Sequence, residues 1–185
     1  MDFLKVTDWE SETEKRVEEA METFRKGYNC AQAVGIAFAD CYGVPTNLMA
    51  RMASSFGGGI GRMRETCGAA CGMFLLAGLE VSNAQDTPDA QGADAVPYPD
   101  AEVKKKNYEV VQRLASDFRA ETGSLLCREL LGLAPIGSTA LPDTSLSPVP
   151  EARTQAYYQK RPCIRMVETA VRIYMNYLKE KYNKK

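Results

Sequence analysis

Apolar residues recur at helical spacing in one segment of the chain after another, and this periodicity constrains the fold more than any other feature. Val17, Ala20, Met21 and Phe24 lie three or four positions apart, with Glu and Lys residues between them. Such spacing places apolar side chains on one face of a helix. No segment shows the alternation of apolar and polar residues that is typical of a half-buried strand. The sequence therefore predicts an all-α protein.

Capping residues, glycines and prolines divide the chain into about six helices. Gly27 ends the first helix, Asn29 caps the second, and Pro162 begins the last. The helices are expected at 8–26, 30–42, 46–55, 65–80, 100–122 and 162–182, with one or two further turns at 127–131. Two proline-rich segments, 81–99 and 133–158, are expected to be loops.

The length and charge of the chain limit its organisation and its partners. A chain of 185 residues is long enough for one domain with a full core, so we expect a single-domain helical bundle over 1–185. The formal net charge is −1, whereas nucleic acids and anionic membranes usually select a basic surface. No apolar run reaches the ~18 residues of a transmembrane helix, and no signal peptide is recognisable. We expect a cytoplasmic protein that binds neither nucleic acid nor membrane.

Six cysteines and no histidine narrow the chemistry. In a reducing cytoplasm, this modest number of thiols indicates metal binding or redox work rather than a disulfide scaffold. Without histidine there can be no Ser–His or Cys–His catalytic pair, and no His-ligated zinc or haem. Any metal must therefore be held by cysteine, carboxylate or backbone oxygen.

Four of the six thiols are expected at helix N-termini. They are Cys30, Cys67, Cys127 and Cys163. The helix dipole and the free N–H groups at such a position favour an anion, so they should lower the pKa of the thiol. The thiolate is the form that binds metals and attacks disulfides. Cys41 and Cys71 lie inside or late in their predicted helices and lack this stabilisation.

Five short motifs stand in a fixed order along the chain. They are N-C-A-Q-A from Asn29, F-G-G-G-I-G-R from Phe56, C-G-A-A-C-G from Cys67, C-R-E-L-L-G from Cys127 and P-C at Pro162. This series resembles the C_GCAxxG_C_C family, whose members are described as redox-active. The resemblance spans about 25–80, 100–132 and 160–180, which is most of the chain.

The resemblance implies a shared redox site at four hallmark cysteines, which map to Cys30, Cys67, Cys127 and Cys163. It places the motif glycines at Gly68 and Gly72 and leaves Cys41 and Cys71 outside the pattern. Relative to shorter family members, 81–99 and 133–158 are insertions. The resemblance supplies no defined reaction, so the substrate stays open.

Two functions are compatible with four clustered thiols, whereas four inert thiols at four helix starts would be a coincidence. The first is thiol–disulfide electron transfer with a redox partner protein or a small-molecule redox substrate, in which the four cysteines are the catalytic groups of an oxidoreductase. The second is a zinc or iron–sulfur module that carries electrons or metal without turnover, with the same four cysteines as ligands. Replacing Cys67 by Ser should abolish either activity, and Cys41→Ser should abolish neither.

The loop from Phe56 to Arg62 contains four glycines in five positions, which excludes regular structure. Its N–H groups could cradle a phosphate or another anion of a cofactor, although G-x-x-x-x-G-K-[ST] is absent. The candidate residues for such a site are Gly58, Gly59, Gly61 and Arg62. The favoured alternative is a tight turn that lets Cys67 approach other helices. Arg62 and Arg64 could lower the pKa of Cys67, steer an anionic substrate or simply remain solvated.

Overall fold

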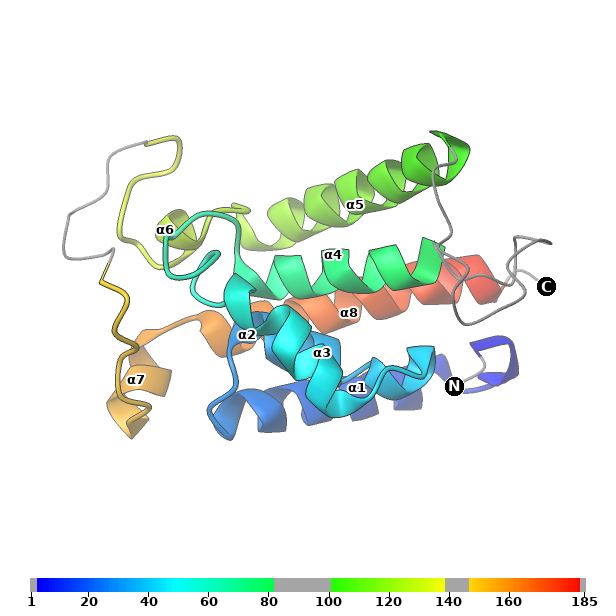
Figure 1. Ribbon diagram of the computed structural model, residues 1–185, viewed down its shortest axis with the longest axis horizontal. Helices are drawn as coiled ribbons and strands as arrows, with labels where there is room; N and C mark the ends of the chain where they lie inside the picture. Colours follow the sequence, from blue (N-terminus) through cyan, green and yellow to red (C-terminus); the bar gives the residue numbers. More distant parts are fainter. Residues whose placement is uncertain (1–2, 82–100, 139–146, 184–185) are drawn as a thin grey trace.

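The structure is a computed structural model that describes residues 3–81, 101–138 and 147–183. These residues contain eight α-helices and no strand, so the predicted all-α fold is confirmed (Figure 1). The helices are α1 (Trp9–Arg25), α2 (Cys30–Ile36), α3 (Thr46–Ala53), α4 (Gly68–Val81), α5 (Ala101–Thr122), α6 (Cys127–Leu130), α7 (Gln155–Lys160) and α8 (Cys163–Tyr182). None of these helices is both long and apolar enough to span a membrane.

The four longest helices, α1, α4, α5 and α8, lie side by side and enclose the core (Figure 1). The buried face of α8 repeats every three or four residues through Val167, Val171, Tyr174 and Leu178, all fully buried. The helix α2 packs mainly on α4, and α1 packs mainly on α8. The shorter helices α6 and α7 lie at the same end of the bundle (Figure 1).

Side-chain caps fix several helix starts close to their predicted positions. Asp8 is the N-cap of α1, and its carboxylate accepts a hydrogen bond from the Ser11 N–H at 2.9 Å. Asn29 and Gln32 form a reciprocal capping box at the start of α2, with hydrogen bonds of 2.9 and 3.0 Å. Because these caps use residues within one turn, the sequence pattern was sufficient to find Asn29, whereas the N-cap of the first helix was decided by the structure.

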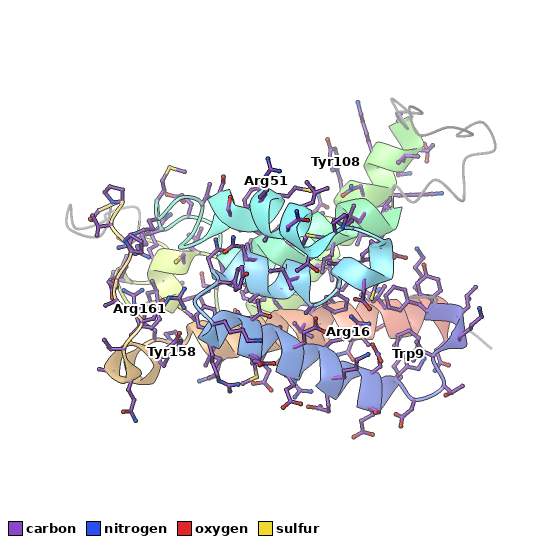
Figure 2. All side chains as sticks on the ribbon, turned by 60° about the horizontal axis from the view of Figure 1, so that its bottom comes forward. Trp9, Arg16, Arg51, Tyr108, Tyr158 and Arg161 are labelled. Carbon is purple, nitrogen blue, oxygen red and sulfur yellow. The ribbon has the colours of Figure 1, made fainter. Side chains whose placement is uncertain are left out.

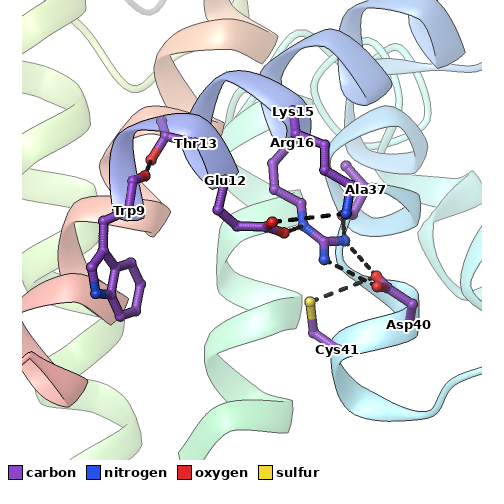
Figure 3. Close-up of polar contacts among 8 residues, drawn as sticks. All are labelled: Trp9, Glu12, Thr13, Lys15, Arg16, Ala37, Asp40 and Cys41. Atoms are coloured by element: carbon purple, nitrogen blue, oxygen red, sulfur yellow. Dashed lines mark hydrogen bonds and ion pairs between the residues drawn. The ribbon is translucent and has the colours of Figure 1, made fainter. Parts of the chain in front are cut away.

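The predicted helix 30–42 is interrupted by a contact from another helix. Arg16 of α1 is buried, and its Nη1 donates a hydrogen bond to the carbonyl of Ala37 at 2.7 Å (Figure 3). The N–H of Cys41, which would bond that carbonyl in a continuous helix, instead donates to Phe38 at 3.0 Å. The α-helix therefore ends at Ile36, and a 3-10 turn follows.

The start of the fourth helix and part of one predicted loop differ from what the sequence predicted. The fourth helix begins at Gly68 rather than near residue 65, because the preceding residues pair with a distant segment. Segment 82–100 and residues 139–146 lie outside the described residues. Part of the predicted loop 133–158 belongs to α7, whose N-cap Thr154 accepts a hydrogen bond from the Tyr157 N–H at 3.2 Å. Whether 81–99 and 133–158 are insertions stays a prediction.

Candidate functional site

A pocket of about 310 Å³ lies at the end of the bundle where α7 and α6 are found. Four cysteines that are far apart in the sequence line it: Cys30, Cys67, Cys127 and Cys163. Figure 2 shows Arg161, which also lines the pocket, at the opposite end of the molecule from Trp9. The structure therefore brings the four predicted cysteines together in one place.

All four pocket cysteines stand at helix starts, as predicted. Cys30, Cys127 and Cys163 are the first residues of α2, α6 and α8, and Cys67 directly precedes α4. The four helices thus converge with their positive dipole ends toward the pocket. Such an arrangement favours a negative charge within the pocket, either a thiolate or a bound anion.

A short antiparallel pairing fixes Cys67 beside Cys127. The N–H of Cys67 donates to the carbonyl of Leu125 at 2.8 Å, and the N–H of Cys127 donates to that of Glu65 at 2.7 Å. The residues between these pairs form an isolated antiparallel bridge. Backbone hydrogen bonds thereby hold the two cysteines diagonally across this bridge, although they come from distant parts of the chain.

Two glycines leave room for the thiol-bearing residues. A Cβ at Gly59, whose φ is +75°, would lie 2.6 Å from the Cβ of Cys127. A Cβ at Gly68 would lie 2.8 Å from the carbonyl oxygen of Phe56 and 3.3 Å from the Cβ of Cys30. Because real side-chain contacts are longer than these distances, glycine at both positions allows the loop and α4 to approach Cys127 and Cys30.

The glycine-rich loop uses many of its own N–H groups. Gly58, Gly59, Gly61 and Arg62 all line the pocket. The N–H groups of residues 60, 61, 62, 64 and 65 donate to carbonyls of residues 55–59, with lengths of 2.7–3.3 Å. These donors are therefore engaged within the loop, which favours the tight turn over an anion cradle made of backbone. A cofactor site at these four residues stays a prediction.

Cys163 and Cys30 form a polarised pair. A hydrogen bond from the Cys30 thiol, aided by the charges of Arg161, Arg153 and Arg64, lowers the pKa of Cys163 to about 7 despite burial. The same hydrogen bond, together with burial, raises the pKa of Cys30 well above its ordinary value. One proton on Cys30 thus stabilises a thiolate on Cys163.

The pKa values of the other two pocket thiols are raised, which corrects the prediction of four acidic thiols. Burial is the main reason that the pKa of Cys67 rises, and the neighbouring Cys127 adds to the effect. Burial also raises the pKa of Cys127, although Arg64 opposes the rise through a hydrogen bond and its charge. Helix N-termini favour a thiolate, but the loss of water around a buried sulfur outweighs that effect here.

Cys41 and Cys71 are absent from the described lining of the pocket. Cys41 follows α2, and its thiol lies 3.6 Å from the Oδ1 of Asp40, beside the Arg16 network shown in Figure 3. Burial raises the pKa of Cys41 to about 12 and that of Cys71 to about 11. Neither thiol lines the pocket, although Cys71 lies one turn after Cys67 and the neighbouring Cys127 contributes to the rise in its pKa.

The residues that the structure describes do not fit the predicted metal centre. Within the described ranges, no group of three or more Cys, Asp or Glu side chains is arranged to hold a metal ion. The four pocket thiols share a cavity without forming a set of ligands. We therefore derive no chemistry through zinc or an iron–sulfur cluster.

Sequence reasoning missed two arginines that line the pocket, Arg153 and Arg161. Arg161 stands two residues before Cys163, so its proximity to a hallmark cysteine was a usable signal. Arg153 belongs to the segment predicted as a proline-rich loop, and nothing local marks it. Its place in the pocket depends on contacts with Phe24 and Tyr157, whose rings lie 4.6 and 4.9 Å from its guanidinium.

Alkylation of Cys163 should follow a titration with a midpoint near pH 7. Because the thiolate is the reactive form and its pKa is lowered to about 7, the rate falls as the pH drops below that value. Removing the donor by Cys30→Ala should raise the pKa of Cys163 and move the midpoint upward. Iodoacetamide labelling of reduced protein, followed by peptide mapping, measures both. A wild-type midpoint near the ordinary thiol value of about 8.5 would contradict this polarised pair.

Comparison with known proteins agrees with the order of the motifs and the position of the pocket. The family model described as "Putative redox-active protein (C_GCAxxG_C_C)" matches residues 28–177, a range that contains all four pocket cysteines. No curated protein and no solved structure matches the chain. Because the family model covers well over half of the sequence, the chain belongs to the C_GCAxxG_C_C family of redox-active proteins.

Proposed function

We propose that the protein is a thiol-based oxidoreductase that transfers electrons by thiol–disulfide exchange. Cys163 is the attacking thiolate and Cys30 is the resolving thiol. The observation that carries this proposal is that Cys30 and Cys163 lie in one pocket lined by arginines, close enough for each thiol to change the pKa of the other. A nucleophile with a pKa close to ambient pH is well suited to disulfide exchange, because it combines a high thiolate fraction with good nucleophilicity.

The reaction consists of two exchanges. The Cys163 thiolate attacks one sulfur of a substrate disulfide, and the other sulfur leaves as a thiolate. Cys30 then loses its proton and attacks the Sγ of Cys163, which releases the second substrate thiolate. Two electrons pass to the substrate, which is reduced to two thiols, and the protein is oxidised to a Cys30–Cys163 disulfide.

We assign Cys67 and Cys127 to the same catalytic set as a second dithiol. Both interact electrostatically with Cys30, and the backbone pairing holds them diagonally across one short bridge. Exchange between the pairs would give a Cys67–Cys127 disulfide and restore the thiols of Cys30 and Cys163. Four thiols would then deliver four electrons per chain. Cys67→Ser should limit the protein to two electrons rather than abolish disulfide cycling, although abolition is the result expected from the sequence alone.

Oxidation of the reduced protein should first yield the Cys30–Cys163 disulfide. The experiment adds hydroxyethyl disulfide, a neutral reagent, to anaerobically reduced protein and maps the disulfides after acid quenching. The number of electrons that each reduced chain donates is then measured for Cys67→Ser and for the control Cys41→Ser. This number tests whether Cys67 and Cys127 act as a second dithiol. Oxidation that begins elsewhere would overturn the assignment of Cys163 and Cys30. Stoichiometric zinc, or iron with sulfide, in protein purified without oxygen would overturn the thiol–disulfide proposal as a whole.

A further inference from the structure

The pocket has a large excess of positive side chains. Four arginines line it: Arg62, Arg64, Arg153 and Arg161. Glu151 is the only acidic residue in its described lining, and this carboxylate is paired with Arg161. The chain as a whole carries a net charge of −1, so the excess is a local feature of this pocket.

Other elements of the fold hold the arginines in place. The Nε of Arg62 donates to the carbonyl of Ser147 at 2.7 Å, and Arg161 lies over the ring of Tyr157 at 5.2 Å. Arg64 is buried and hydrogen-bonded to the Cys127 thiol. Guanidinium groups that are held in this way can bind an anion without a large loss of side-chain entropy.

Arg153 offers a donor that has no acceptor among the described residues. Its guanidinium stacks against Phe24 and Tyr157, and its Nη2 donates to the carbonyl of Tyr28 at 3.2 Å. Its Nη1 is buried and has no hydrogen-bond partner within the described part of the chain. A buried donor of a charged group is normally satisfied, so this atom favours a ligand that brings an acceptor into the pocket.

We infer that the oxidised substrate of this pocket is a small disulfide that carries carboxylate groups. This inference rests on the proposed thiol–disulfide exchange and adds the class of substrate. The planar fork of a guanidinium matches the two oxygens of a carboxylate. A phosphate cradle would need free N–H groups, and three of those in the glycine-rich loop, at residues 60–62, are already engaged.

The size of the pocket selects a small molecule. Its volume of about 310 Å³ is at the lower end of the roughly 300–1,000 Å³ that is typical of small-molecule sites. Cys67 and Cys127 are only 5% and 7% exposed, so in this scheme they are oxidised through Cys30 and Cys163 rather than directly by the substrate. In the reaction, the carboxylates lie on the arginines while Cys163 attacks the nearer sulfur. The departing thiolate and then the second thiolate leave as reduced product, and the protein retains the Cys30–Cys163 disulfide.

Three disulfides of similar length and different charge test the inference. They are dithiodipropionate with two carboxylates, hydroxyethyl disulfide with no charge, and cystamine with two ammonium groups. The rate at which each oxidises the reduced full-length chain in a single turnover is divided by its rate with a free small thiol. We expect the acidic reagent to react roughly tenfold faster than the neutral one, and cystamine more slowly than either. Added salt should reduce these ratios.

Two arginine variants distinguish an effect on substrate recognition from an effect on the pKa of Cys163. Arg153→Gln should lower the ratio of acidic to neutral rates, although it also slows every reagent by raising the pKa of Cys163. Arg113→Gln is the control, because Arg113 carries the same charge but pairs with Glu180, near the end of α8 that is opposite Cys163. This variant should leave the ratio of rates unchanged. If the wild-type protein reacts equally fast with the acidic and the neutral reagent, after division by their rates with a free small thiol, the inference about the substrate is overturned. The proposed thiol–disulfide exchange would not be affected by that result. Failure of all three reagents to oxidise the pair would overturn the proposed function itself.

Discussion

Cys163→Ser should slow the oxidation of the reduced protein by small disulfides by more than roughly a thousandfold, because the nucleophile itself is lost. A serine hydroxyl is not ionised near neutral pH, whereas the pKa of Cys163 is lowered to about 7 by Cys30 and the surrounding arginines. The measurement is the single-turnover rate of disulfide formation, followed by quenched alkylation. The matched control is Cys41→Ser, which removes a thiol outside the pocket lining and should leave the rate unchanged.

Replacing the resolving thiol should give a different product from replacing the attacking thiol. In Cys30→Ser the first exchange can still occur, but no thiol of this pair remains to release the second half of the substrate. A mixed disulfide on Cys163 should therefore accumulate, and intact-protein mass spectrometry would detect it. Equal losses in Cys163→Ser and Cys41→Ser would show that the six thiols have been sorted incorrectly.

Gly72→Ala should destabilise the protein by about 1–3 kcal/mol, because the added methyl group meets atoms that cannot move away easily. A Cβ at this position of α4 would lie 2.7 Å from the Cβ of Val34 and 3.0 Å from the carbonyl oxygen of Ala31. Both contacts belong to α2, which packs closely on α4. Chemical denaturation followed by circular dichroism would give the free energy of unfolding.

Gly78→Ala is the matched control, since the same substitution on the same helix meets open space. The nearest atom to a Cβ at Gly78 is the side-chain nitrogen of Asn107, at an ordinary contact distance of 3.8 Å. Alanine favours a helix interior over glycine by about 1 kcal/mol, so this variant should be as stable as the wild-type protein or more so. The same change in stability for both variants would show that the contact between α2 and α4 does not require glycine at position 72.

The close contact between α2 and α4 affects both the stability of the bundle and the relative positions of the pocket cysteines. Gly68 is one turn before Gly72 on α4, and its missing Cβ lets the start of the helix lie against Cys30. Gly72→Ala should push α4 away from α2 and thus move Cys67, directly before α4, relative to Cys30. We therefore expect this variant to slow oxidation of the second thiol pair as well as to lower stability.

Local sequence signals were sufficient to predict the positions of most of the helices. The caps at Asp8 and Asn29 act through hydrogen bonds within a single turn, so the residues that form them are neighbours in the chain. The break after Ile36 could not be read in this way, because it depends on Arg16 of another helix taking the carbonyl of Ala37. The helix α7 was also missed, since the prolines around it obscured its short pattern.

The positions of the four cysteines at helix starts were readable from the sequence, whereas their individual chemistry was not. The starts of α2 and α8 follow local residues, Asn29 and Pro162, and the motifs mark the same cysteines. The start of α4 also depends on the pairing of Thr66 with Leu126. The pKa of a thiol depends instead on burial and on charges brought from elsewhere in the chain. Cys163 is acidic because Cys30 donates to it and Arg153 and Arg161 lie nearby, whereas Cys67 is not because burial prevails. Charge and solvation act through space, so folding decides which of four similar cysteines carries the thiolate.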